Sequence, residues 1–289
     1  MTTLKLVVLE IYRALNNVYS GWILWNLFLA FIPLLISFLL FRRHALTKGW
    51  AIAACFTLGL MSVVGTRLRT PWVFDVIARK VDTAIGGALA MSLNALWLVA
   101  ILVLTLAMSI LIFKRDRTLR SVFWWLAFVT FMAFLPNAPY VLTDIIHLIR
   151  GVSSGNIPIW VAALVIIPIH AVAILLGFEA YVISLLNLDS YLVKHNHRNW
   201  ILPTELTIHL LNAIGIYLGR FIRFNSWDLV TDPSSVVMTT INTLTSTRPL
   251  AVIAVTFVVL TVLYWLMKQI TLGLKLRIQY VRKGIDVIN

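Results

Sequence analysis

The stretch Trp22–Phe41, WILWNLFLAFIPLLISFLLF, contains no charged side chain from end to end. About 20 predominantly apolar residues, rising about 1.5 Å each, are enough to cross a hydrocarbon core about 30 Å thick. The stretch therefore predicts a transmembrane helix. Similar apolar runs recur along the chain, which predicts that it crosses the membrane several times.

The composition agrees with this prediction. Hydrophobic residues make up 61% of the 289 residues and charged residues 12%, with a mean hydropathy of +0.93, whereas soluble domains carry about 25% charged residues. The net charge of +13 does not predict nucleic-acid binding, because Lys and Arg lie between the apolar runs and after the last one. They are typical of topology determinants and lipid-headgroup anchors. We expect one transmembrane domain over residues 1–289, with the lipid bilayer as its environment.

The predicted fold class is all-α, a polytopic bundle of about seven transmembrane helices, or six if the second candidate is re-entrant. That second candidate is short and rich in Ala and Gly, while the long fifth one contains Pro168, which predicts a kink. The candidate spans are Trp22–Phe41, Trp50–Thr66, Leu93–Phe113, Ser121–Leu135, Ile157–Leu186, Pro203–Leu218 and Pro249–Met267.

Both ends of the chain have a character of their own. Leu4, Val8, Ile11 and Leu15 follow helical spacing within residues 1–19, which predicts an N-terminal helix lying at the membrane interface. At the other end, residues 268–289 are basic and are expected to form a cytoplasmic tail.

Alternating spans with a cytoplasmic C-terminus place 14 of the 24 Lys and Arg residues inside, a modest excess that favours this orientation. The segment 67–92 opposes it with several basic residues outside. Two spans separate the loop after Leu135 from the loop after Leu218, so both loops lie on one side of the membrane. In this orientation that side is extracytoplasmic.

The segment Phe134–His147, FLPNAPYVLTDIIH, carries the first candidate site. Its two prolines predict a helix break, and the region 136–147 resembles the interrupted helices that line polar cavities. On the helix that follows, Asp144 and His147 share a face, a spacing suited to general acid/base chemistry or to two ligands of a metal. We count Asn137 and Tyr140 as candidate ligand-binding residues. Alternatively, Asn137 and Asp144 satisfy backbone groups freed by the prolines, and His147 sits among the headgroups.

The segment Gly215–Asp228, GIYLGRFIRFNSWD, carries the second. Gly215 and Gly219 predict close helix packing. Arg220 and Arg223 lie one turn apart and are suited to an oxyanion, because a guanidinium binds oxyanions through two N–H groups. Asn225 and Asp228 add polar groups. An ordinary belt of arginines that contact lipid phosphates or Asp228 is the alternative.

Polar residues inside the predicted spans form a third group. Ionisable groups in a membrane are costly unless they face a cavity or a partner, so they are expected to face the bundle interior. These residues are Glu205, His209 and Asn212 on one helix, and His170 and Glu179 on another.

Three stretches resemble an integral-membrane family of bacteria known as domain of unknown function 1361. They are WNLFLAFIPL at Trp25–Leu34, FLPNAPYVLTDIIHL at Phe134–Leu148, and GIYLGRFIRFNSWD at Gly215–Asp228. The resemblance covers Trp22–Phe41 and Ser121–Met267, and it sets residues 50–113 apart as an inserted helical pair. It implies a multi-pass protein of the bacterial cytoplasmic membrane, but it implies no reaction and no cofactor.

These observations support a hypothesis in which the two motif segments form one extracytoplasmic site for an anionic ligand such as a lipid headgroup. If the protein is an enzyme, Asp144 and His147 would be the acid/base pair or metal ligands. One alternative is a transporter or channel whose path is lined by the intramembrane Glu and His residues. Another is a scaffold that catalyses nothing.

Overall fold

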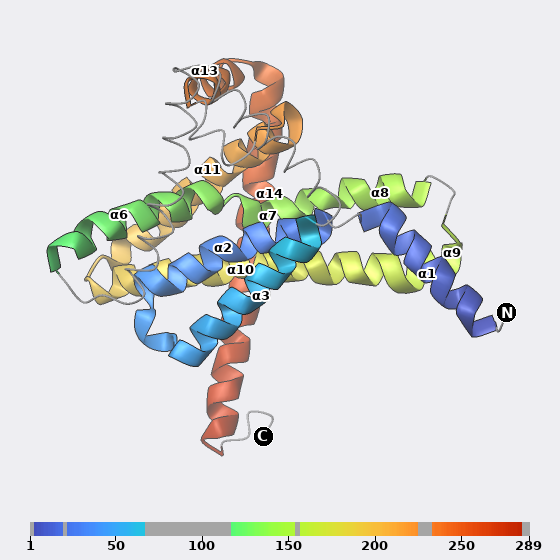
Figure 1. Ribbon diagram of the computed structural model, residues 1–289. Coiled ribbons are helices and arrows are strands. Elements are labelled where there is room, and N and C mark those ends of the chain that lie inside the picture. The colour runs from blue at the N-terminus through green and yellow to red at the C-terminus, as the bar shows by residue number, and fades with distance from the viewer. Residues whose placement is uncertain (1–2, 20–21, 67–116, 154–156, 225–232, 285–289) are drawn as a thin grey trace, which may run out of the picture.

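The computed structural model describes residues 3–19, 22–66, 117–153, 157–224 and 233–284, and no strand occurs among them. The N-terminal part contains α1 (Thr3–Tyr19), α2 (Trp22–Phe41), the short turn η1 (Arg43–Ala45) and α3 (Lys48–Thr66). The helix α2 begins and ends at the residues predicted from its apolar run. All of these elements can be followed in Figure 1.

A broken helical run follows, formed by α6 (Arg117–Phe134), α7 (Asn137–Tyr140), η2 (Val141–Asp144) and α8 (Ile145–Ser153). The break falls at Leu135 and Pro136, as the two prolines predict. It is short, because Pro136 keeps helical backbone angles and the helix resumes at once. The whole run is therefore one span candidate, Val122–Ser153, longer than the predicted Ser121–Leu135.

The C-terminal half contains the remaining helices. They are α9 (Ile159–Val161), η3 (Ala162–Ile166), α10 (Ile167–Lys194), η4 (Arg198–Trp200), α11 (Ile201–Tyr217), η5 (Leu218–Ile222), α13 (Pro233–Leu244) and α14 (Thr247–Arg282). The elements η3 and η5 are wide π-helical turns. The first of them precedes Pro168, which lacks a backbone N–H, so the irregularity predicted in this span takes the form of a π turn.

Among the described residues, five helices are long and apolar enough to cross a membrane, so the chain is a multi-pass all-α membrane protein. They overlap five of the predicted spans. The predicted Trp50–Thr66 forms α3, whose apolar part Gly49–Gly65 is shorter. The predicted Leu93–Phe113 and the segment 67–92 lie outside the described residues.

The main core is centred on α2 and α10, which pack along each other (Figure 1). Side chains from α6, η2, α11 and α14 complete it, among them Phe131, Val141 and Leu260. Many large apolar residues on the outer faces are exposed, for example Val129, Leu175 and Val258. This pattern is typical of helices that contact lipid.

A second apolar cluster joins the N-terminal helix to the rest of the molecule. Ala14 and Val18 of α1 pack with Trp22, Val161 and Ile166, and α1 lies beside α8 and α9 (Figure 1). The segment 1–19 is thus helical where it is described, and its interfacial location stays a prediction.

The helix α14 crosses the others, and its C-terminal half extends beyond them (Figure 1). With 36 residues it is about 54 Å long. The basic segment predicted as a tail, 268–289, therefore begins within this helix and is helical as far as Arg282.

Candidate functional site

The break at Pro136 is stabilised by side chains of the same segment. Asn137 Nδ2 donates a hydrogen bond to the Phe134 carbonyl at 3.0 Å, and Thr143 Oγ1 donates to the Tyr140 carbonyl at 2.7 Å. Asn137 thus satisfies a carbonyl at the break, as the alternative interpretation of this segment expects. Asp144 does not take that role, because its carboxylate accepts hydrogen bonds from two other helices.

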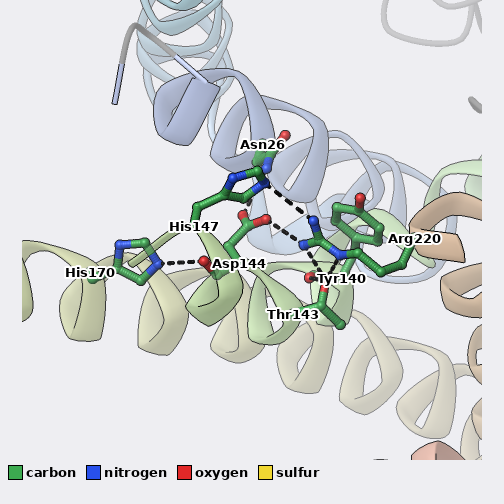
Figure 2. Close-up of polar contacts among 7 residues, drawn as sticks. All are labelled: Asn26, Tyr140, Thr143, Asp144, His147, His170 and Arg220. Carbon is green, nitrogen blue, oxygen red and sulfur yellow. Dashed lines mark hydrogen bonds and ion pairs between the residues drawn. The ribbon is translucent and has the colours of Figure 1, made fainter. Parts of the chain in front are cut away.

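The Asp144 carboxylate is the centre of the site shown in Figure 2. Asp144 is buried, with 1% of its surface exposed. One oxygen accepts a hydrogen bond from Asn26 Nδ2 at 2.7 Å, and the other accepts one from Arg220 Nη2 at 2.8 Å. The three side chains come from α2, η2 and η5, so this carboxylate connects three segments far apart in sequence.

The Arg220 guanidinium is held from several sides. Its Nε donates to Thr143 Oγ1 at 2.9 Å, and its Cζ lies 4.5 Å from the centre of the Tyr140 ring, a cation–π contact. Its Nη1 donates to His147 Nε2 at 3.3 Å, since a guanidinium has no acceptor. Because Asp144 neutralises it and Thr143 and Tyr140 fix its plane, the guanidinium has one orientation.

Two histidines flank the aspartate (Figure 2). His170 Nε2 lies 3.0 Å from the backbone carbonyl of Asp144 and must donate, since a carbonyl only accepts. His147 is half-buried and contacts the Trp22 ring, with the ring centres 4.6 Å apart and the planes tilted by 39°. His170 is buried behind the aspartate, whereas His147 lies on the accessible side.

Close glycine contacts bring the two motif segments together. A Cβ atom added to Gly215 would lie 3.1 Å from the Pro136 ring, and one added to Gly219 would lie 3.4 Å from the Tyr140 ring. The predicted close packing of these glycines is confirmed, and its partner is the broken segment. This approach places Arg220 within reach of Asp144.

The two arginines differ in exposure, since Arg223 is exposed and the Arg220 side chain is only 13% exposed. The sequence spacing predicts that the stripe of Glu205, His209 and Asn212 continues to Gly219 and Arg223. A π turn holds about one residue more than an α turn, and η5 falls at this point, so Arg220 takes the inward position. Arg223 is exposed and has a left-handed backbone with φ of 70°. Its predicted part in an anion site stays a prediction.

Two candidate residues, Asn225 and Asp228, lie outside the described residues. Glu179 is placed on another face of α10, where Thr271 Oγ1 donates to its Oε1 at 2.8 Å. Within the described ranges, no group of three His, Cys, Asp or Glu side chains has the arrangement to hold a metal ion.

The remaining intramembrane candidates belong to a second polar cluster. Glu205, His209 and Asn212 are all buried, but no direct bond joins the first two. Glu205 accepts from Tyr264 and Lys268, while His209 and Asn212 both bond the hydroxyl of Tyr181.

Sequence reasoning did not select several of the residues that complete these clusters. Asn26 is a polar side chain inside an apolar run, and Lys268 is a charged side chain at the edge of a predicted span. These two features were the available sequence signals for a role in the clusters. The other residues missed are Trp22, Thr143, Tyr181, Asp189 and Tyr264.

A family model described as a protein of unknown function, DUF1361, matches residues 95–262, more than half of the chain. The chain belongs to the DUF1361 family. The match includes the broken segment, Arg220 and the second polar cluster as far as residue 262. No curated protein and no solved structure matches the chain.

The extent of the match corrects the extent of the resemblance inferred from motifs. It includes residues 95–113, part of the segment set apart as an insertion, and it does not include Trp22–Phe41. In this DUF1361 protein, Asn26 and Trp22 therefore contribute to the site from outside the matched region.

Proposed function

We propose that this DUF1361 protein binds the anionic group of a lipid at the membrane interface, through Arg220 and His147. The observation that carries the proposal is the 3.3 Å separation of Arg220 Nη1 and His147 Nε2. Asp144 lies behind them with 1% of its surface exposed and neutralises only the arginine. Because a guanidinium only donates, His147 Nε2 accepts from Nη1 in the structure, and an anion that binds here would replace Nε2 as the acceptor of this N–H.

The chemistry favours an oxyanion. An anion that accepts the Nη1 N–H in place of Nε2 favours protonation of His147, and the Nε2–H then becomes a second donor to the same phosphate group. Thr143, Asp144 and Tyr140 hold the guanidinium in place, so little side-chain entropy is lost when the anion binds. A pre-oriented arginine beside a histidine is suited to a phosphate or carboxylate.

The position in the bundle favours a lipid headgroup over a deeply buried ligand. Trp22 begins one span candidate and Arg220 lies near the end of another, Arg198–Ile222. Tryptophan and arginine are enriched where the hydrocarbon meets the headgroups. With the topology expected from the basic residues, this end faces the extracytoplasmic side of a bacterial cytoplasmic membrane.

The geometry favours binding over acid/base catalysis by Asp144 and His147. Both Asp144 oxygens already accept hydrogen bonds, from Asn26 and Arg220. His147 faces Arg220 instead of the carboxylate. The aspartate is therefore a positioning residue for the arginine.

The test is native mass spectrometry of the purified full-length protein in detergent, with phosphatidylglycerol or phosphatidylcholine added. We expect wild type to retain phosphatidylglycerol preferentially and Arg220→Gln to lose that preference. Arg150→Gln is the matched control, because Arg150 is exposed on the same helical run three residues after His147. A parallel series with inorganic phosphate tests whether a free anion competes for the site.

A second variant protects the test against misfolding. His147→Gln leaves the Asp144–Arg220 pair in place and removes only the imidazole that would bind the anion, so it should fold and still lose selectivity. Competition by phosphate at the concentration of lipid would assign the site to a free anion instead of a headgroup. If both variants retain phosphatidylglycerol as wild type does, the proposal is wrong.

A further inference from the structure

The second polar cluster joins three helices through one lysine. Lys268 of α14 donates from Nζ to Asp189 Oδ2 of α10 at 2.8 Å and also to Glu205 Oε1 of α11. The Tyr264 hydroxyl donates to the same oxygen of Glu205. Asp189 and Glu205 are each 8% exposed.

The charges of this cluster do not balance when every group has its ordinary protonation state. Two carboxylates face one ammonium, which leaves one negative charge. The other groups facing them are the hydroxyl of Tyr264 and, on its far side, the ring of His209, centred 4.7 Å from the Tyr264 ring. Arg42, the residue after α2, instead donates to Asn187 Oδ1 at 3.4 Å.

The two carboxyl groups are neighbours, because each accepts a hydrogen bond from the same Lys268 nitrogen. Two ionised carboxylates have no hydrogen to place between them and repel, whereas one proton turns the contact into a hydrogen bond. Both residues lie in span candidates, where an uncompensated charge is costly. One added proton thus removes the repulsion and the net charge together.

We infer that Asp189 and Glu205 form a proton-binding site, in which one proton is held between the two carboxyl groups beside the Lys268 ammonium. The site is separate from the Asp144 site. Along the continuous run of α11 and η5, Glu205 and Arg220 are 15 positions apart, about 22 Å. The proton site therefore lies toward the opposite end of the same helix.

Neutral polar groups extend from this site toward the middle of the bundle. Beyond Tyr264, His209 Nδ1 lies 2.6 Å from the Tyr181 hydroxyl, which also accepts from Asn212 Nδ2 at 2.9 Å. Apolar side chains, among them Ile216 and Phe178, are buried farther along the helices. A proton at the carboxyl pair thus has hydrogen-bonding groups on one side and an apolar barrier before the Asp144 site.

Infrared spectroscopy of the full-length protein at neutral pH tests this inference, because a protonated carboxyl group has its own C=O absorption. We expect Asp189→Asn and Glu205→Gln each to remove one such absorption of equal area. The double variant should remove no more than either single one, since the proton is held jointly. Each single variant keeps one carboxylate for Lys268 and is charge-balanced, so both should fold.

Two further variants sharpen the test. Glu179→Gln, on the same α10 helix, should leave the absorption of the pair unchanged. Lys268→Met leaves two carboxyl groups without a cation, so each should be protonated and the absorption of the pair should rise about twofold. The inference is overturned if neither single variant loses a neutral-carboxyl absorption, or if the two losses add in the double variant. It is also overturned if sodium ions abolish the neutral-carboxyl absorption of the wild-type protein. None of these outcomes depends on anion binding at Arg220.

Discussion

Gly215 of α11 packs directly against Pro136, so that a Cβ atom on the glycine would lie 3.1 Å from both Cβ and Cγ of the proline. The absence of a side chain at this position lets α11 approach the break in the preceding helical run. The approach brings Arg220 to Asp144. The packing contact between Gly215 and Pro136 thus positions the polar site.

Gly215→Leu should destabilise the protein by about 1–3 kcal/mol, because overpacking a tight contact displaces backbone or side chains. Thermal unfolding in detergent measures the effect. Gly273→Leu is the control, since nothing lies within 4 Å of a Cβ atom at that glycine. Equal melting temperatures for wild type and Gly215→Leu would show that α11 can move away from Pro136 without cost.

Gly177→Ala should also destabilise, because the added Cβ would lie 2.9 Å from a methyl carbon of Val141. The cost is expected at about 1–3 kcal/mol. Val141→Ala alone leaves a cavity, but in the Gly177→Ala background it makes room for the new methyl group. A double-mutant cycle should therefore show a favourable coupling, and purely additive effects would contradict the contact.

Asp144→Asn should destabilise the protein by about 3 kcal/mol, since it leaves a largely buried guanidinium without a counter-ion. The side chain of Arg220 is only 13% exposed. The double variant Asp144→Asn with Arg220→Gln removes the unpaired charge and should recover part of the lost stability. Denaturant unfolding of the two single variants and the double variant measures this, and a double variant less stable than Asp144→Asn would argue against the ion pair.

Tyr181→Phe should cost about 1–3 kcal/mol, because it removes the hydroxyl that bonds both His209 and Asn212 and leaves two buried polar groups without that partner. Tyr140→Phe is the matched control. It keeps the ring that faces Arg220, so its stability should stay close to that of wild type. Equal free energies of unfolding for Tyr181→Phe and Tyr140→Phe would mean that the Tyr181 hydroxyl contributes little to stability.

The sequence alone determined the class of the protein and most of its helices. Span length follows from apolar residues set against the thickness of a membrane, which is a property of one continuous segment. The exact bounds of α2 and the helix break at Pro136 follow from local chemistry in the same way. The contact of Gly215 with another helix was also predicted, because small residues at helical spacing favour close approach.

The tertiary structure decided which polar residues meet. Asn26 and Asp144 are separated by 118 positions, and Asp189 and Lys268 by 79, so no local pattern pairs them. The choice of Arg220 over Arg223 depended on a π turn, which shifts the inward face by one residue in a way that helical spacing does not predict. Local segments fix where helices form, but the packing of distant helices against one another fixes the partners of each charge.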